Sequence, residues 1–468
     1  MAGTRDRAST LAEEHFGPAA LGDQRLTDRL VAVADQMLRH PDGSFPDKFK
    51  NPADLDGFYN LMANPKVTHA QVLAAHYAHT LDAMRAHPGV VLLVHDTTVL
   101  DYSGLTAIAE LGQVGDGHGR GYYCHNSLAV TPQRQVLGLA QQILHTRRRV
   151  PKGETRAARR RRPDRESRLW KKASQAIPAA PLGQLWVDVA DRGADVLEFM
   201  DHEAAAGKHF VVRSQHNRRV RIRRDGQWQT TKLHDYVRTR PAQGTRTVAV
   251  PAGPGRPART AVVGVAWEEV ELLPSRQPRG EERGVPVRVW VIRVWELQPP
   301  TGGEALEWIL LTNVAVACLA DACERVDWYY CRWVIEEYHK AQKTGCAIER
   351  MQFSYAARLQ PEIAVLSVVA TWLLQLRDAS RDPVQQAEPA AKWVPALWLE
   401  VLAVWRHGEL RPDWTVRDFF MALARLGGHQ NRTHDHPPGW LVLWRGWTEL
   451  QTMAAGAATQ RAKRSKET

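Results

Sequence analysis

The sequence predicts an α/β protein, in which helical regions at both ends flank a central part that contains a mixed sheet. Short apolar runs at residues 90–94 and 185–189 are typical of strands buried on both faces. Alternating apolar positions within residues 210–297 indicate further strands. At 468 residues the chain is long enough for about three domains. We expect a helical domain at 1–70, a sheet-containing domain at 71–384 with a β-rich insertion at about 210–300, and a helical region at 385–468.

The formal net charge of +11 favours a polyanionic partner, with nucleic acid first and an anionic membrane surface second. A soluble basic protein without such a partner explains the charge equally well. The longest apolar run, Ile363–Leu374, is shorter than the roughly 20 residues that a membrane-spanning helix needs. We therefore expect a buried core helix there and no membrane partner.

The cysteine pattern favours a reducing compartment. The number of cysteines is odd and no two have CxxC spacing, which argues against a disulfide framework and a zinc knuckle. The N-terminal residues lack the apolar segment of a signal peptide, so we expect a cytoplasmic protein. A GxxxxGK[ST] loop is absent from the sequence, so no nucleotide cofactor is expected. The cysteines are Cys124, Cys318, Cys323, Cys331 and Cys346.

Residues 21–66 predict a small helical module. Apolar residues from Leu26 to Met37 recur with helical spacing, and Pro41-Asp42-Gly43 ends that helix. A second helix is expected over residues 51–62. A helical module with basic outer residues is a reasonable DNA-binding unit, although a solvated helical bundle fits this segment equally well. The basic residues off the apolar stripe include Arg25, Arg29 and Arg39.

Residues 147–172 are dense in arginine and lysine and interrupt the α/β pattern between two expected strands. One interpretation is a clamp on the DNA backbone, because each phosphate contact releases counterions and adds affinity without sequence preference. The alternative is a disordered, self-repelling loop. The other DNA-binding features of the chain favour the clamp.

Two aspartates follow apolar strands, where α/β sheets usually place their functional sites. Asp96 follows VVLLVH, and Asp191 follows LWVDVA. Taken singly, each is more commonly a cap for the next helix. Asp188 and Asp195 are rivals to Asp191, but Asp188 points to the opposite face of its strand and Asp195 lies a turn further on.

A more specific pattern lies near residue 330, in a helix expected over residues 321–344. At 100° per residue, one polar stripe about 80° wide holds a carboxylate, three cations and an aromatic ring. Glu337 falls outside this stripe. A solvated face usually mixes its charges and a core face is apolar, so the stripe favours contact with a metal ion and a phosphate backbone together. The stripe contains Tyr329, Arg332, Glu336, Lys340 and Lys343.

The residue types suit phosphodiester chemistry. Divalent cations such as Mg²⁺ prefer the hard oxygen ligands of Asp and Glu. Two such ions, roughly 3.5–4 Å apart, stabilise the attacking and leaving oxygens of an in-line displacement. Arginine can hold a phosphate through a bidentate fork, so Arg332 and Lys343 are candidate phosphate contacts.

These residues resemble those of bacterial insertion-sequence transposases of the DDE type, in the hairpin-forming group with the Y-(2)-R-(3)-E-(6)-K signature. Tyr329, Arg332, Glu336 and Lys343 meet every spacing of that signature. Other segments also resemble the family and follow its order, so the resemblance covers nearly the whole chain. They are ALGDQRLTDRL, HDTTVLDYSG, DRGAD, FVVRSQH, EWILLT, RWVIEEYHKAQKTG, ALARLGG and LWRGWTELQ.

The resemblance implies an RNase H-like catalytic core with a β-rich insertion between the second Asp and the Glu. It implies that Asp96, Asp191 and Glu336 bind two Mg²⁺ ions per active site, for which Mn²⁺ is expected to substitute. It also implies an endonuclease that excises a mobile element: hydrolysis cuts one strand, the freed 3′-OH forms a DNA hairpin, and the opened 3′-OH ends join target DNA.

The resemblance further implies contacts to distorted DNA. Trp308 matches the tryptophan on which family members stack a flipped base, and Trp333 adjoins the signature arginine. Without the resemblance, packing in the core is the better interpretation of either ring. Arg213, in the FVVRSQH segment, and Lys340 are further expected DNA contacts.

The expected partners are the inverted-repeat DNA of the transposon ends, target DNA and a second copy of the chain in a synaptic homodimer. The C-terminal region would supply dimer contacts. Two other functions stay open: a regulator that binds ends without cutting, and an RNase H-like nuclease without strand transfer. The candidate apolar anchors of the dimer are Trp393, Trp398, Trp405, Trp440, Trp444 and Trp447.

Overall fold

The structure is a computed structural model, and most of the chain is described. The described residues are 7–41, 44–108, 110–147, 153–155, 158, 162, 164–250, 258–275, 283–300, 305–411, 413–432, 435 and 437–467. Asp42 and Gly43 of the expected helix stop lie outside the described residues, as do Arg148, Arg149 and Arg159 to Arg161 of the arginine-rich stretch.

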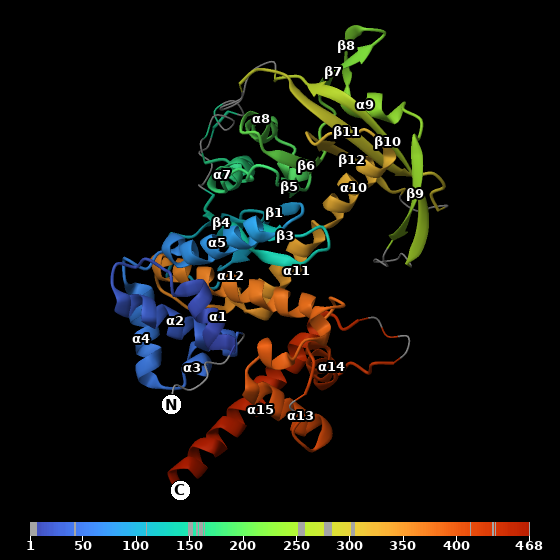
Figure 1. The fold of residues 1–468 in the computed structure, drawn as a ribbon. Coiled ribbons are helices and arrows are strands. Elements are labelled where there is room, and N and C mark those ends of the chain that lie inside the picture. The colour runs from blue at the N-terminus through green and yellow to red at the C-terminus, as the bar shows by residue number, and fades with distance from the viewer. Residues whose placement is uncertain are drawn as a thin grey trace.

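The centre of the molecule is a mixed sheet with the strand order β4-β3-β1-β5-β6 (Figure 1). β1, β3 and β4 pair antiparallel, whereas β5 is parallel to β1 and β6 is parallel to β5. This arrangement of sheet and helices is compatible with an RNase H-like core. The strands are β1 (Val91–Asp101), β2 (Gly112–Val114), β3 (Gly119–Val130), β4 (Val136–His145), β5 (Trp186–Ala190) and β6 (His209–Arg213).

The β-rich segment continues this sheet instead of forming a separate one. β12 pairs antiparallel with β6, and the resulting sheet has 12 strands. Strand residues of the insertion share an apolar cluster with α8, α9 and the core strands β5 and β6. Its elements are β7 (Arg219–Arg224), β8 (Gln227–Lys232), α9 (Leu233–Arg238), β9 (Gly244–Val250), β10 (Arg259–Leu272), β11 (Val287–Glu296) and β12 (Glu307–Thr312).

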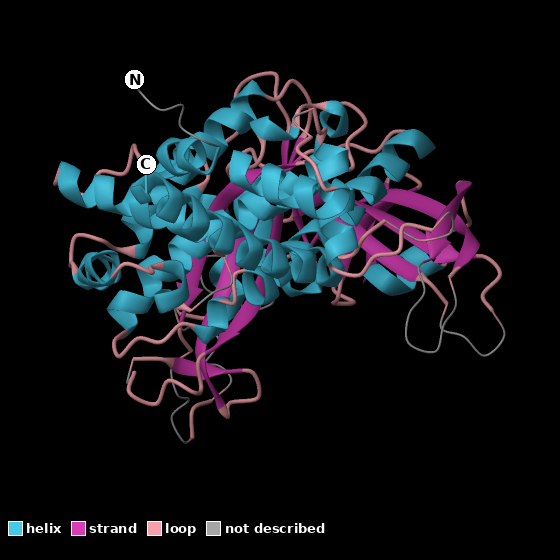
Figure 2. Cartoon of the chain, turned by 90° about the horizontal axis from the view of Figure 1, so that it is seen from below, coloured by secondary structure: helices cyan, strands magenta, loops and turns pink. Residues whose placement is uncertain are grey.

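Helices cover both faces of the core sheet (Figures 1 and 2). α5 and α12 pack together and against β4, while α7 contacts β3 and β4, and α8 contacts β6. The apolar run Ile363–Leu374 lies in α12 and is buried, as the sequence predicts. Among the described residues α12 alone has the length and hydropathy of a membrane span, but 89% of its most apolar window is buried inside the protein. The helices are α5 (His69–Ala86), α7 (Leu169–Ala176), α8 (Leu197–Ala205), α10 (Leu319–Tyr330), α11 (Trp333–Lys340) and α12 (Ala356–Ala379).

The N-terminal module is helical, as predicted. Leu30, Val33 and Met37 are buried, whereas Leu26 at the end of the stripe is only partly buried. The side chain of Asp23 caps α2 by accepting a hydrogen bond from the Arg25 amide, and Asn51 caps α4 in the same way. The module consists of α1 (Arg7–Phe16), α2 (Gln24–Arg39), α3 (Phe45–Lys48) and α4 (Pro52–Ala63).

The C-terminal region is also helical, but most of its tryptophans are not surface anchors. Trp398 and Trp447 are buried and pack edge to face at 5.0 Å between ring centroids, with Trp372 of α12 beside them. Trp393, Trp440 and Trp444 are partly buried against the same core, and only Trp405 is exposed, at 41%. The prediction that Trp398 and Trp447 are dimer anchors is therefore wrong, because both rings are buried in the chain's own core. The helices are α13 (Ala396–His407), α14 (Val416–Leu426) and α15 (Trp440–Glu467).

We predict that Trp447→Ala lowers the free energy of unfolding by about 3–5 kcal/mol, since it removes the ring that joins α15 to Trp372 and Trp398. Chemical denaturation followed by tryptophan fluorescence and circular dichroism measures this loss. Trp405→Ala is the matched control, with an expected loss below about 1 kcal/mol. Equal losses in the two variants would contradict the assignment of Trp447 to the core.

Candidate active site

The parallel pairing of β1 and β5 places the two candidate aspartates side by side. The last paired residues are His95 and Ala190, so Asp96 and Asp191 are the next residues in register. The sequence predicted that Asp96 directly follows a strand. This is wrong, because Asp96 lies within β1, which goes on to pair with β3 as far as Asp101. Asp191 directly follows β5, and its Oδ1 atom accepts a hydrogen bond of 2.8 Å from the Gly193 amide.

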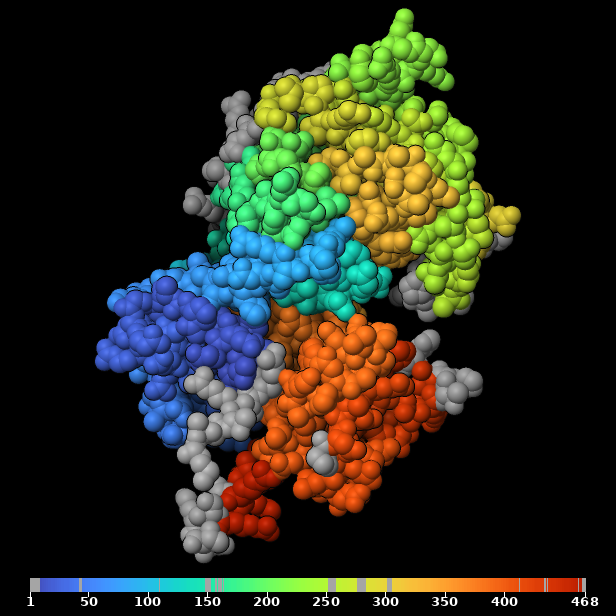
Figure 3. Space-filling view, in the orientation of Figure 1, coloured from blue at the N-terminus to red at the C-terminus, as the bar shows by residue number. Residues whose placement is uncertain are grey.

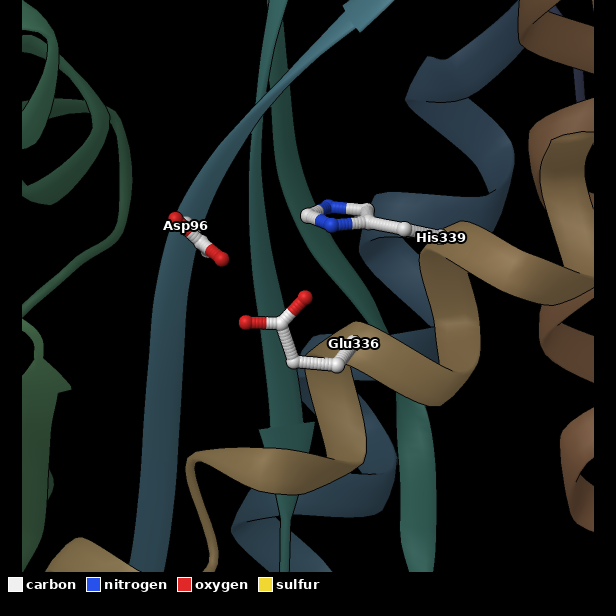
Figure 4. A group of neighbouring side chains, drawn as sticks. All are labelled: Asp96, Glu336 and His339. Carbon is white, nitrogen blue, oxygen red and sulfur yellow. The ribbon is translucent and has the colours of Figure 1, made fainter. Parts of the chain in front are cut away.

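Glu336 reaches Asp96 from α11. Figure 4 shows its carboxylate directed towards the side chain of Asp96. The Arg332 guanidinium lies between the two acids, with Nη1 at 3.1 Å from Glu336 Oε1 and 3.6 Å from Asp96 Oδ2. One cation thus offsets part of the repulsion between two carboxylates from distant parts of the sequence.

Glu337, the neighbour of Glu336, has a different partner. Its Oε2 atom forms an ion pair of 2.6 Å with Nη1 of Arg377 in α12. The choice of Glu336 over Glu337, made from the helical stripe, agrees with these contacts.

The site strongly disfavours net negative charge. Burial, followed by the charges of Asp191 and Glu336, raises the pKa of Asp96 to about 7, although Arg332 and the Thr97 amide act in the opposite direction. A carboxyl group with this pKa is partly protonated at neutral pH, and a bound cation would favour its ionised form. The site therefore fits a divalent cation by its donor set and by its electrostatics.

His339 is a site residue that the sequence reasoning missed. One ligand atom from each of Asp96, Glu336 and His339 lies within 4.8 Å of the other two, and Figure 4 shows the ring beside both carboxylates. Its spacing of three residues from Glu336, which puts two side chains on one helix face, was the available signal. Asp191 lies outside this group of three.

A buried hydrogen bond fixes the state of the His339 ring. The Asn126 Nδ2 atom donates to His339 Nε2 at 3.1 Å, and Gln142 in turn donates to Asn126 Oδ1 at 2.7 Å. Burial lowers the pKa of His339 to about 3, so the ring is neutral and carries its proton on Nδ1. The imidazole is then a hydrogen-bond donor at the site, and the carboxylates remain the better metal ligands.

The rival aspartates have structural partners. Asp188 is buried on the opposite face of β5, where its Oδ1 atom contacts His95 Nε2 at 2.5 Å. Asp195 is buried and forms an ion pair with Arg218, and its Oδ2 atom accepts hydrogen bonds from the amides of Gln215 and His216. Both residues support the fold around Asp191.

The helix that carries the signature is not continuous. α10 ends at Tyr330, α11 begins at Trp333, and a π-helical turn occupies Ala341–Gly345. The ideal stripe is therefore wrong for Lys343, because the π-turn changes its angular position, whereas Lys340 still lies within α11. Lys343 Nζ lies 3.2 Å from Glu349 Oε1.

The remaining signature residues border the site differently. Tyr329 is buried at the end of α10. Lys340 is exposed and lines a surface pocket together with Glu336 and Trp333. The pocket also includes Arg381, which lies just after α12. Trp333 is 57% exposed, and the Arg332 guanidinium lies 4.9 Å from its ring centroid.

Trp308 and Arg213 lie on paired strands of the insertion boundary. Trp308 in β12 is partly buried, and its ring packs edge to face on Tyr330 at 4.9 Å between centroids. Arg213 in β6 donates to the backbone oxygen of Glu307 at 3.2 Å.

The basic residues of the N-terminal module have intramolecular partners. Arg25 pairs with Asp23 but stays exposed, and Arg29 approaches Asp54 at 3.4 Å. Arg39 pairs with Asp35 at 2.9 Å and donates to Ser9, which ties α2 to α1. Arg25 is thus the most accessible of the three.

The described part of the arginine-rich stretch is ordered by internal ion pairs. Arg147 pairs with Glu166, and Arg162 pairs with Glu154. Three cations converge on Glu198 of α8, namely Arg165, Arg168 and Lys171. These described cations hold α7 and its approach in place, so they are poor candidates for the expected clamp.

The comparison with known proteins supports a transposase that binds DNA. Residues 8–67 match the family model described as transposase DNA-binding. The matched segment includes the N-terminal helices up to α4 and ends just before α5 begins at His69.

We predict that Asp96→Asn stabilises the metal-free protein above pH 7. The unfolded carboxyl ionises near 3.8 and the folded one near 7, so the wild-type protein loses stability as the pH rises through this window. The variant does not lose it, and its gain at pH 8 is about 1–3 kcal/mol. Thermal unfolding in EDTA at pH 4 and pH 8 measures the difference.

Asp28→Asn is the control for this experiment, because Asp28 is exposed on α2. Added Mg²⁺ is expected to raise the melting temperature of the wild type more than that of Asp96→Asn, since a ligand of the folded state stabilises it. A variant that is less stable than the wild type at pH 8 would contradict the electrostatic description.

Proposed function

We propose that this protein is a DDE transposase of the hairpin-forming group, which excises a mobile element and joins its 3′-OH ends to target DNA. The observation that carries the proposal is the placement of Asp96 and Asp191 directly after the paired part of β1 and β5, with Glu336 of α11 and Arg332 beside Asp96. The match of residues 8–67 to transposase DNA-binding domains supports it independently.

The carboxylates would hold two Mg²⁺ ions, which supply Lewis-acid stabilisation of the attacking and leaving oxygens during phosphodiester cleavage. Arg332 already lies beside two of these acids, and its planar fork suits a phosphate oxygen. Exposed Lys340 adds positive charge on the same side of α11. These side chains would orient the scissile strand against the acids.

Hairpin formation requires a sharply bent DNA end, and the aromatic residues beside the site suit a displaced base. Trp308 is held edge to face by Tyr330, which leaves the indole only partly buried. A base stacked on such a ring recovers part of the few kcal/mol that unstacking costs. Under this proposal Trp308 stabilises distorted DNA, and Trp333 is a second flat surface near Arg332.

The proposal includes a synaptic homodimer with transposon-end and target DNA. The N-terminal module of each copy would hold one transposon end. The end would be cut by the partner copy. Trp405 is the tryptophan of the C-terminal region that remains exposed for such contacts among the described residues.

We predict that Glu336→Gln abolishes excision, with a loss of at least about 10³-fold, because an amide cannot replace an ionised metal ligand. The purified protein is incubated with Mg²⁺ and a plasmid that carries the inverted repeats flanking its own gene. Hairpin-ended excised DNA is then scored on denaturing gels. Glu449→Gln is the matched control, since it makes the same chemical change at an exposed position of α15.

The same assay separates the other two functions. Binding of the ends without any cut by the wild type would indicate a regulator, and cuts without hairpins or joined products would indicate a nuclease. Identical products from the wild type and Glu336→Gln would show that the proposed triad is wrong.

We predict that Trp308→Ala slows hairpin formation by about 10-fold or more, consistent with a stacking loss of roughly 1–3 kcal/mol, and leaves first-strand nicking near the wild-type rate. Single-turnover time courses on a labelled end resolve the two steps. Trp308→Phe keeps a flat ring and is expected to recover part of the rate. Equal loss of both steps in Trp308→Ala would indicate a packing role for the ring.

A further inference from the structure

The β7–β8 hairpin projects from the insertion at the far end of the molecule from the C-terminal helices (Figures 1 and 3). An Asp225-Gly226 turn with positive φ values of 49° and 77° closes the hairpin. β8 is the last strand in the order of the sheet, so one of its edges is unpaired in the described structure. The hairpin is thus a two-stranded ribbon whose turn end projects from the body of the protein.

The two faces of the ribbon differ. Val220 and Ile222 are buried in the apolar cluster of the insertion. Side chains alternate along a strand, so the arginines of β7 between and beside them point to the other face. The residues opposite them on β8 share that face. The outer face therefore carries Arg219, Arg221 and Arg223 with their register partners Lys232, Thr230 and Trp228.

The ribbon is strongly cationic. Residues 219–232 contain five cationic side chains and one carboxylate, Asp225. Arg221 pairs with Glu271 and lies 4.4 Å from the centroid of the Trp228 ring, which is 51% exposed. Within the described part of the chain, the other four cations form no ion pair with a carboxylate.

We propose that this ribbon binds the phosphate backbone of duplex DNA outside the catalytic site. The inference rests on the proposed function, which brings long DNA to the protein. Alternate residues of a strand advance about 6.6 Å, so the outer face presents its arginines as a row of regularly spaced positive charges to the polyanionic backbone. A two-stranded ribbon also fits the dimensions of the major groove.

The test measures how binding of a labelled 40-base-pair duplex of arbitrary sequence depends on salt, with the full chain in EDTA so that no cutting occurs. Each phosphate contact adds about 0.9 to the slope of log affinity against log salt. Arg219→Gln/Arg223→Gln is expected to lower that slope by about 1.8 and to weaken binding at least about tenfold at 0.1 M salt. Both residues lie on the outer face, so the melting temperature should not change.

The matched control is Lys392→Gln/Arg406→Gln, which removes the same charge from exposed positions of the C-terminal region. This control is expected to keep the wild-type slope. An unchanged slope in Arg219→Gln/Arg223→Gln would overturn the proposal. So would unchanged DNA binding together with a shifted sedimentation coefficient, which would assign the ribbon to a protein contact.

The excision assay keeps this inference separate from the proposed function. If the variant has a lower slope but the wild type never cuts transposon-end DNA, the result supports DNA binding by the ribbon and contradicts the transposase mechanism. Normal excision by the wild type with an unchanged slope contradicts the ribbon alone.

Discussion

The candidate site depends on the point at which β1 and β5 stop pairing. Their parallel ladder ends at His95 and Ala190, so that Asp96 and Asp191 are the next residues in register, although β1 goes on to pair with β3. Bringing two acids together in a partly buried place is costly, and the raised pKa of Asp96 records that cost. The fold sustains it because the strands beneath are fully buried and because Arg332, carried on a separate helix, contributes an opposite charge.

The surroundings of the acids also restrict how they can move. Asp188 and His95 contact each other on the reverse face of the two strands, and Asp195 anchors the loop after Asp191 through Arg218. On the helix side, Glu337 and Arg377 hold α11 against α12. The neutral His339 ring lies beside Asp96 and Glu336, and its hydrogen bond with Asn126 holds it in place. Rigid support of this kind suits chemistry in which the positions of the acids decide the rate.

The sequence predicted the helical ends and the central strands well, because buried strands and amphipathic helices leave local patterns, and the role of the candidate acids stays a prediction. It predicted Glu336 over Glu337, and the contacts of both residues agree. It could not reveal the break between α10 and α11 or the π-turn, since these depend on packing rather than on helical periodicity. It also missed His339, whose relevance depends on a hydrogen bond to Asn126, 213 residues away in the chain. The burial of Trp398 and Trp447 was equally hidden, because only tertiary contacts separate a core ring from a surface one.

The ladder between β6 and β12 has a mechanical consequence. β6 pairs with β5 on one edge and with β12 on the other, so an unbroken series of hydrogen-bonded strands joins Asp191 to the outer ribbon. The insertion cannot pivot about a flexible tether, because any rotation would shear backbone hydrogen bonds next to the acids. A force applied to the ribbon is therefore transmitted to Asp191 through the hydrogen-bonded strands. The insertion and the core would then move together, without a hinge between them.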